Sequence, residues 1–293
     1  MIILVIGLLR YDAGKTTWVM ELIELLKEYG VKAIPFKPVG GHNAWYQYNT
    51  LKYSIELGTL VGEDAYKLAR VSGLTNMIEI LSPIDILLAP PDPSLYENDY
   101  RRYIDDSSLL EKQAVLARIT LPYGEVYTTT HYVIEDNYVK TIKSLRTDLE
   151  ILKNKIKNVM KTTSQIFLKL LESPTIINGL ALIQERLEKE SDVLVIESFN
   201  NVALPIPSAI KADYVFVVAP GKILLYKGDD YRRALAVYGT VPGLLAYETA
   251  PVISLLKNPV LVLDWEPRLQ EKHVVIKPSE AAEKALSLVL EKS

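Results

Sequence analysis

The sequence predicts an α/β fold in which a mostly parallel sheet is flanked by helices, and two observations support this prediction. Apolar runs of strand length alternate with segments of helical periodicity in the first and last thirds of the chain. The first run, residues 2–6, is apolar at every position, as expected for a strand buried on both faces of a parallel sheet. We therefore expect a single α/β domain over residues 1–293, interrupted by an insertion.

Each expected element follows from its own pattern. Beyond Lys15, apolar residues recur at helical spacing until Gly30 supplies a stop, and the acidic pair at 63–64 opens a second helix to about residue 72. The remaining expected helices lie near 229–238 and 278–291. The expected strands are 2–6, 31–36, 192–197, 213–219, 259–264 and 273–276.

The insertion, about residues 95–190, has a different pattern. A Pro122-Tyr123-Gly124 turn between two β-rich runs predicts a hairpin over 113–134. Apolar residues then recur at spacings of three and four, with no proline or glycine before Pro174, which predicts one long helix over 138–172. That helix either packs on its own domain or forms a dimer or partner surface. A further helix is expected at about 175–190.

The segment between the first strand and the first helix is the most informative one for function. It runs from Gly7 to Gly14-Lys15-Thr16-Thr17 and has the strand–loop–helix context of a phosphate-binding P-loop. Lys15 is expected on the terminal phosphates, and the Thr16 hydroxyl on Mg²⁺. The usual P-loop spacing, Gly-x4-Gly-Lys-Ser/Thr, requires glycine at position 9, but this chain has Leu9 there. The nucleotide-binding residues that we expect are Gly7, Tyr11, Asp12, Ala13, Gly14, Lys15, Thr16 and Thr17.

Three further positions suggest a metal-dependent phosphate site. Lys37 follows the second strand at its carboxyl end, where ligands of open α/β sheets bind, and would act with Lys15 as a catalytic cation. Glu197 ends an apolar strand, as a Walker-B carboxylate does, and Asp64 opens a helix. Thr16, Asp64 and Glu197 are therefore the expected Mg²⁺ ligands. Each of two residues also has a simpler interpretation. Asp64 could be an acid in the first turn of a helix, which the helix dipole favours, and Lys37 could be a solvated loop lysine.

The order of these motifs along the chain, and the gap between the two lysines, resemble those of the dethiobiotin synthetases. The resemblance rests on Lys15-Thr16, Lys37-Pro38-Val39, Asp64-Ala65 and the strand ending in Glu197, and covers about residues 1–93 and 190–220. It implies a P-loop NTPase fold with a seven-stranded, mostly parallel sheet, phosphate binding by the two lysines, and Mg²⁺ held by the other three residues. The wider group includes cobyrinic acid amidases and metallocentre NTPases. As a whole the chain is similar to archaeal proteins described as P-loop ATPases or GTPases.

The substrate-binding residues of that family have no counterparts here. Gly40-Gly41-His42-Asn43 follow the Lys-Pro-Val triplet in place of small hydroxyl residues, and Ser198-Phe199-Asn200-Asn201 follow Glu197 in place of glycines. The nucleotide machinery therefore carries over and the biotin-precursor site does not.

Composition excludes several function classes. The net charge of −3 gives no basic footprint for nucleic acid, and no apolar run reaches membrane-spanning length. The absence of cysteine excludes disulfides and thiolate sites and fits a cytoplasmic protein. The three histidines, at 42, 131 and 273, show no metal-binding spacing. Abundant Ile, Leu, Lys, Glu and Tyr is typical of thermophilic proteins.

Two functional hypotheses follow. The first is an Mg²⁺- and ATP-dependent enzyme, an ATPase or a ligase acting on an unknown small-molecule acceptor, with His42 or Asp12 as candidate general bases. The second is a nucleotide switch that controls homodimerisation or a protein partner, in which Arg10 acts across the dimer. GTP is the alternative nucleotide, although the only Asn-Lys pair, Asn154-Lys155, falls inside the predicted long helix.

Overall fold

The chain forms two compact units in a computed structural model that describes residues 1–239, 247–266 and 278–291. Unit 1 comprises residues 1–38, 67–77 and 177–293, and unit 2 comprises 39–66 and 78–176. The expectation of a single domain with an insertion at 95–190 therefore needs revision, because the second unit begins directly after Pro38.

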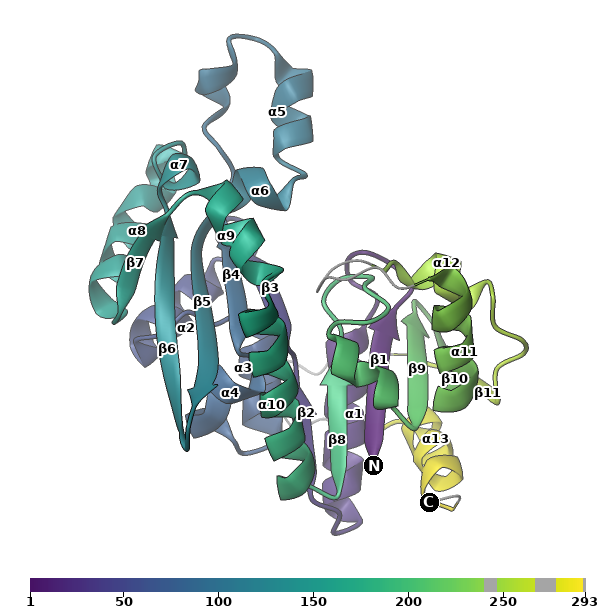
Figure 1. The fold of residues 1–293 in the computed structure, drawn as a ribbon. Helices are drawn as coiled ribbons and strands as arrows, with labels where there is room; N and C mark the ends of the chain where they lie inside the picture. The colour runs from purple at the N-terminus through teal and green to yellow at the C-terminus, as the bar shows by residue number, and fades with distance from the viewer. Residues whose placement is uncertain (240–246, 267–277, 292–293) are drawn as a thin grey trace. The chain divides into compact units, whose positions relative to one another are not determined.

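Unit 1 is built on a six-stranded sheet in the order β11-β10-β9-β1-β8-β2 (Figure 1). The four strands β9, β1, β8 and β2 are parallel, whereas β10 and β11 are antiparallel additions at one edge. The resemblance implied seven strands, and the structure describes six in this sheet. The strands are β1 (Ile2–Gly7), β2 (Ala33–Phe36), β8 (Val193–Glu197), β9 (Tyr214–Ala219), β10 (Lys222–Lys227) and β11 (Leu261–Asp264).

Helices cover both faces of this sheet, with α1 and α13 on one face and α11 on the other (Figure 1). The parallel strands are buried along almost their whole length, which explains their continuous apolar sequence. The helices of unit 1 are α1 (Lys15–Glu28), η1 (Thr75–Met77), η3 (Pro207–Lys211), α11 (Gly228–Tyr238), α12 (Thr249–Ile253) and α13 (Glu280–Leu290). Two helices, α3 (Glu63–Val71) and α10 (Pro174–Glu190), run from one unit into the other. The strand expected at 273–276 lies outside the described residues.

Unit 2 has a five-stranded mixed sheet in the order β3-β4-β5-β6-β7. Its centre is the β5–β6 hairpin at the position expected for 113–134, and helices α2 and α8 bury apolar side chains against it. The strands are β3 (Val39–Asn43), β4 (Ile84–Leu88), β5 (Ala114–Tyr123), β6 (Val126–Ile134) and β7 (Val159–Thr162). The helices are α2 (Asn49–Leu57), α4 (Ile78–Leu81), η2 (Pro93–Tyr96), α5 (Tyr100–Asp106), α6 (Leu110–Gln113), α7 (Glu135–Tyr138), α8 (Lys143–Lys155) and α9 (Ser164–Leu171).

The prediction of one long helix over 138–172 is wrong. Helix α8 ends at Lys155, Asn158 takes a left-handed φ of 50°, and β7 then pairs in parallel with β6 before α9 begins. The spacing of three and four continues across the break, but Val159 and Ile166 are exposed, so the apolar seam is not continuous. The alternative that this seam forms a dimer or partner surface therefore loses its basis.

A buried glutamate on α1 connects the sheet to the end of the chain. The Glu21 carboxylate accepts hydrogen bonds from the Trp265 indole Nε1, at 3.2 Å, and from the backbone N–H and hydroxyl of Ser279. Ser279 is the N-cap of α13, and its hydroxyl accepts from the N–H of Ala282. One carboxylate thus holds both the residue after β11 and the start of α13.

Replacing Glu21 by Leu is expected to lower the free energy of unfolding by about 2–4 kcal/mol, because three buried donors lose their acceptor. The matched control is Glu24→Leu on the same helix, since Glu24 is partly exposed and lies 4.0 Å from Lys27. Its effect should stay below about 1 kcal/mol. Urea unfolding followed by tryptophan fluorescence measures both, and equal effects would contradict the anchoring role of Glu21.

Candidate functional site

The order of the strands brings the predicted site residues of unit 1 to one edge of the sheet. Strand β8 lies between β1 and β2, all three are parallel, and Val5 is the register partner of Glu197. The loop after β1, the carboxylate that ends β8 and the lysine after β2 therefore meet at the carboxyl edge of the sheet. Residues 160 or more positions apart in the sequence come into contact there.

Glu197 is the centre of this cluster and has no exposed surface. Its Oε1 accepts from the Thr16 hydroxyl at 2.9 Å and from the Lys37 ammonium at 2.5 Å. Its Oε2 is buried and has no hydrogen-bond partner among the described residues. Because a buried unpaired carboxylate oxygen is costly, this atom is a candidate for binding a cation.

The loop of residues 8–14 reaches its shape without glycine at position 9. The left-handed residues in it are Asp12, with φ of 51°, and Gly14, with φ of 92°. Aspartate tolerates this conformation better than most residues with a side chain, and Leu9 is not left-handed, so the departure from the usual glycine spacing introduces no backbone strain. Helix α1 then begins at Lys15, with the N–H of Trp18 bonded to the Gly14 carbonyl.

Lys15 folds back over the end of β1. A Cβ atom on Gly7 would lie 2.9 Å from the Lys15 Nζ and 3.1 Å from its Cδ. Gly7 therefore leaves room for the Lys15 side chain, which is 8 % exposed. Gly7 is also a predicted part of the phosphate-binding loop, and this close approach gives it a packing role as well.

The other residues expected to bind nucleotide differ in accessibility. Ala13 is buried, whereas Tyr11 is 62 % exposed and has the Arg10 guanidinium over its ring. Thr17 lies in the first turn of α1 and is half-buried. The first turn of α1 thus combines a lysine, two hydroxyl side chains and backbone N–H groups at a helix N-terminus, which favours anions.

The sequence analysis missed Trp265, which packs on this loop from the end of β11. A Cβ on Gly14 would lie 2.7 Å from Cζ3 and 2.8 Å from Cη2 of its ring. Gly14 is therefore constrained twice, by its left-handed φ and by the indole. No local signal in the sequence connects residues 14 and 265.

The chemistry of the donors fits Mg²⁺. Mg²⁺ uses one or two carboxylates together with water, a hydroxyl and phosphate oxygens, and Glu197 and Thr16 offer this combination. No group of three His, Cys, Asp or Glu side chains in the described ranges could hold a metal alone. Asp64 lies in the first turn of α3, in the part of that helix assigned to unit 2, and its role as a metal ligand stays a prediction.

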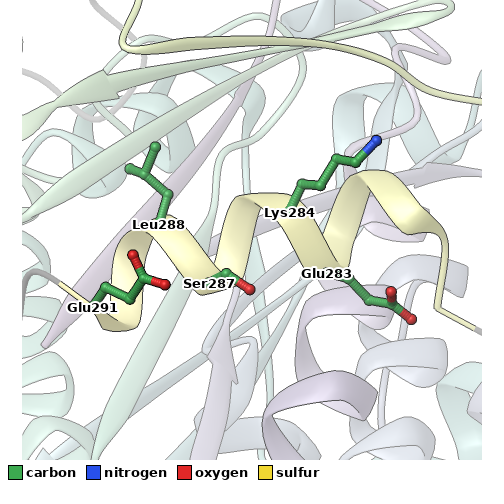
Figure 2. A pocket seen from close by; sticks show the side chains of 5 residues that line it. All are labelled: Glu283, Lys284, Ser287, Leu288 and Glu291. Atoms are coloured by element: carbon green, nitrogen blue, oxygen red, sulfur yellow. The ribbon is translucent and has the colours of Figure 1, made fainter.

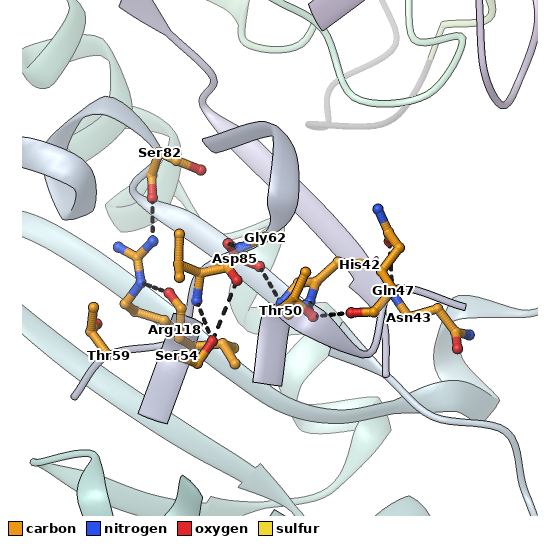
Figure 3. Close-up of polar contacts among 12 residues, drawn as sticks. His42, Asn43, Gln47, Thr50, Ser54, Thr59, Gly62, Ser82, Asp85 and Arg118 are labelled. Atoms are coloured by element: carbon orange, nitrogen blue, oxygen red, sulfur yellow. Dashed lines mark hydrogen bonds and ion pairs between the residues drawn. The ribbon is translucent and has the colours of Figure 1, made fainter. Parts of the chain in front are cut away.

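Unit 2 contains a second polar cluster, which is wholly internal (Figure 3). Asp85 accepts from the Gly62 N–H at 2.6 Å and lies 3.1 Å from the His42 Nε2, whose Nδ1 contacts the Thr50 hydroxyl. Burial alone would favour the neutral acid, but the neighbouring His42 and Arg118 side chains and the Gly62 N–H hold the pKa of Asp85 below its ordinary value. Both His42 ring nitrogens face buried partners, which argues against its candidate role as a general base.

Arg118, also fully buried, serves this interior as a structural cation. It donates to the carbonyls of Leu60 and Ser82, at 2.8 and 2.7 Å, and so joins the segments before α3 and β4 to β5 (Figure 3). Through Arg118 and the Asp85–Gly62 bond, the core of unit 2 fixes the start of α3, where Glu63 and Asp64 lie.

A hollow along α13 does not make a site. Its lining residues, Glu283, Lys284, Ser287, Leu288 and Glu291, all come from that one helix. Figure 2 shows these side chains leaving the helix in different directions, so they do not converge on a ligand.

The chain was compared with protein families, curated proteins and solved structures, and none of these comparisons identifies its family. No protein-family profile matches the chain, and no curated protein matches it, so the resemblance to dethiobiotin synthetases gains no support. A solved structure described as the ATP-binding subunit of an ABC transporter is 13% identical over 87% of each chain, with a TM-score of 0.26. Neither fold nor function follows from a score this low.

The lengths and hydropathy of the helices bear on whether the chain could cross a membrane. Among the described residues no single helix is long and apolar enough to cross a bilayer. Helices α9 and α10 meet the length and composition requirement only as a joined pair, which bends by 49°.

The buried imidazole of His131 is expected to make folding pH-dependent. Burial lowers its pKa, and the hydrogen bond from Nδ1 to the Lys157 carbonyl only partly opposes this. An unfolded histidine titrates near pH 6.5, so below that pH the unfolded chain binds a proton that the folded chain excludes. Stability should therefore fall as the pH drops from about 7 to about 5.5.

Urea unfolding of wild type and His131→Gln across this range measures the effect. The substitution should flatten the dependence of the unfolding free energy on pH, whatever its effect on stability at pH 7. An unchanged slope in the variant would assign the dependence to other groups.

Proposed function

We propose that unit 1 binds a nucleoside triphosphate together with Mg²⁺ at the carboxyl edge of its parallel strands. The observation that carries this proposal is the unpartnered Oε2 of the buried Glu197, whose other oxygen accepts from Thr16 in the first turn of α1. A helix start with lysine and threonine beside a buried acid supplies cation, hydroxyl and backbone donors for a metal–phosphate complex.

Each residue has its own task in this proposal. Lys15 neutralises the terminal phosphates, while Thr16 and Glu197 hold Mg²⁺, with Asp64 as a further candidate ligand. When bound, Mg²⁺ neutralises charge on the phosphates and orients them for transfer. Lys37 pairs with Glu197 in the structure. During the reaction its ammonium group would stabilise negative charge that develops on the transferred phosphoryl group.

The reaction that we favour is hydrolysis of ATP or transfer of its terminal phosphoryl group to a small acceptor. The alternative is a nucleotide switch acting on a partner, in which Arg10 would act across a dimer. Arg10 lies in the loop that precedes α1, where its guanidinium is over the Tyr11 ring. The pairing of Lys37 with Glu197 favours the enzyme.

Calorimetric titration of ATP and GTP with Mg²⁺ tests the binding function. Wild type should bind one of them with a dissociation constant in the micromolar range, and Lys15→Ala should weaken binding at least about tenfold by removing a charge-assisted contact. Lys27→Ala on the same helix is the control, because Lys27 is 67% exposed and should leave affinity unchanged. No binding of either nucleotide to wild type would refute the proposal.

The Lys37–Glu197 pair gives a test that needs no turnover. Lys37→Met leaves a buried carboxylate without its cation, which should destabilise the chain by about 3–5 kcal/mol. Mg²⁺ with nucleotide should then raise the melting temperature of this variant more than that of wild type, because the metal replaces the missing cation.

The control for this experiment is the double variant Lys37→Met/Glu197→Gln. It carries no buried charge at this position, so it should recover stability and lose the enhanced response to Mg²⁺. A response equal to wild type in the single variant would mean that Glu197 does not face the metal.

A further inference from the structure

Unit 2 carries a small arm that the proposed nucleotide site does not use. The arm connects β4 to β5 over residues 89–113, contains η2, α5 and α6, and extends beyond the end of its sheet (Figure 1). Its base is fixed, because Asn137 donates to the carbonyls of Glu111 and Ala114 and Pro91 forms a bridge with Thr141.

The arm has its own internal structure. The rings of Tyr96 in η2 and Tyr103 in α5 meet edge to face at 5.4 Å, and the Tyr96 hydroxyl donates to Asp106. The Asp92 and Asp99 side chains cap η2 and α5. Helix α5 therefore uses the side that carries residues 103 and 106 to pack within the arm.

The opposite side of α5 is apolar and exposed. Tyr100 and Ile104 are 59% and 65% exposed and lie one helical turn apart. At about 100° per residue, positions 100, 101, 104 and 105 fall within an arc of about 140°, so Arg101 and Asp105 lie next to these two side chains, both on the same side of them. We call this side of α5, formed by Tyr100, Arg101, Ile104 and Asp105, the arm face.

The charges on the arm face are arranged against the helix dipole. Arg101 lies in the first turn of α5 and Asp105 in the last, whereas a helix favours acid at its start and base at its end. Neither side chain has an ion-pair partner in the part of the chain that the structure describes. The Asp99 N-cap places one acidic group at the start of α5 but forms no ion pair with Arg101 among the described residues.

A second copy of the same face would offset this arrangement of charges. When two α5 helices pack antiparallel about a twofold axis, Arg101 of each copy lies opposite Asp105 of the other, and Tyr100 packs beside Ile104. The two helix dipoles then also run in opposite directions. The sequence Tyr100-Arg-Arg-Tyr-Ile-Asp-Asp106 is thus self-complementary in charge and apolar at its centre.

We propose that the arm face is a homodimer contact in which two copies of this chain pair α5 antiparallel. The contact is small, so it gives a weak dimer that forms with increasing protein concentration. It requires no nucleotide and therefore stands or falls independently of the function proposed for unit 1.

Sedimentation velocity over a concentration series, without nucleotide, tests the proposal. Wild type should shift from monomer towards dimer as concentration rises. Arg101→Asp and Asp105→Arg should each weaken association at least about tenfold, because each places like charges opposite one another twice. The control Lys189→Glu reverses an exposed charge on α10 and should leave association unchanged.

The decisive sample mixes the two single variants. In a heterodimer of Arg101→Asp with Asp105→Arg, both cross-copy pairs have opposite charges again, so association should return to the wild-type level. A wild type that stays monomeric, a dimer indifferent to both substitutions, or a mixture that fails to associate would each overturn the proposal. Unchanged melting temperatures identify the variants as folded.

Discussion

The buried carboxylate of Glu197 is the constraint on which the candidate site depends. A charge with no exposed surface must find its partners inside the protein, and Glu197 takes them from the first turn of α1 and from the end of β2. Both partners bond to the same oxygen, so an error in either segment leaves a charge uncompensated. The cost of such an error, several kcal/mol, makes the geometry of this edge a condition of folding. The residues proposed to hold nucleotide are therefore held in place before any ligand arrives.

The loop above this carboxylate illustrates how a backbone requirement can be met by different residues. The standard P-loop places glycine where this chain has Leu9, yet the left-handed positions are at Asp12 and Gly14. Only the second of them also excludes a side chain by contact, because the Trp265 indole lies against it. Trp265 is in turn held by Glu21, so the conformation of the loop depends on packing from the far end of the chain.

The sequence was most informative where burial dictates a continuous pattern. Strands β1, β8 and β9 are buried on both faces, and their apolar runs located them closely. The carboxyl ends of β8 and β2 then placed Glu197 and Lys37 near the loop. Local patterns failed where the deciding contact is distant. The left-handed Asn158 and the pairing of β7 with β6 break a periodicity that continues in sequence. The central hairpin of the second unit was predicted, but the extent of the unit was not, because its sheet takes its first strand from residues 39–43, well before the expected insertion.

The discontinuity of unit 1 has a consequence for how the protein is made. Strand β1 leaves the ribosome long before its two neighbours in the sheet, β8 and β9, which follow about 190 and 210 residues later. Unit 2 lies wholly between them in the sequence, so its last residue, 176, is made while β1 still has both edges unpaired. The nascent chain therefore carries a fully apolar strand without partners through most of its synthesis. Long-range pairing of this kind slows folding and exposes the chain to aggregation, so the time needed to translate from β1 to β8 and β9 sets how long that vulnerable state lasts.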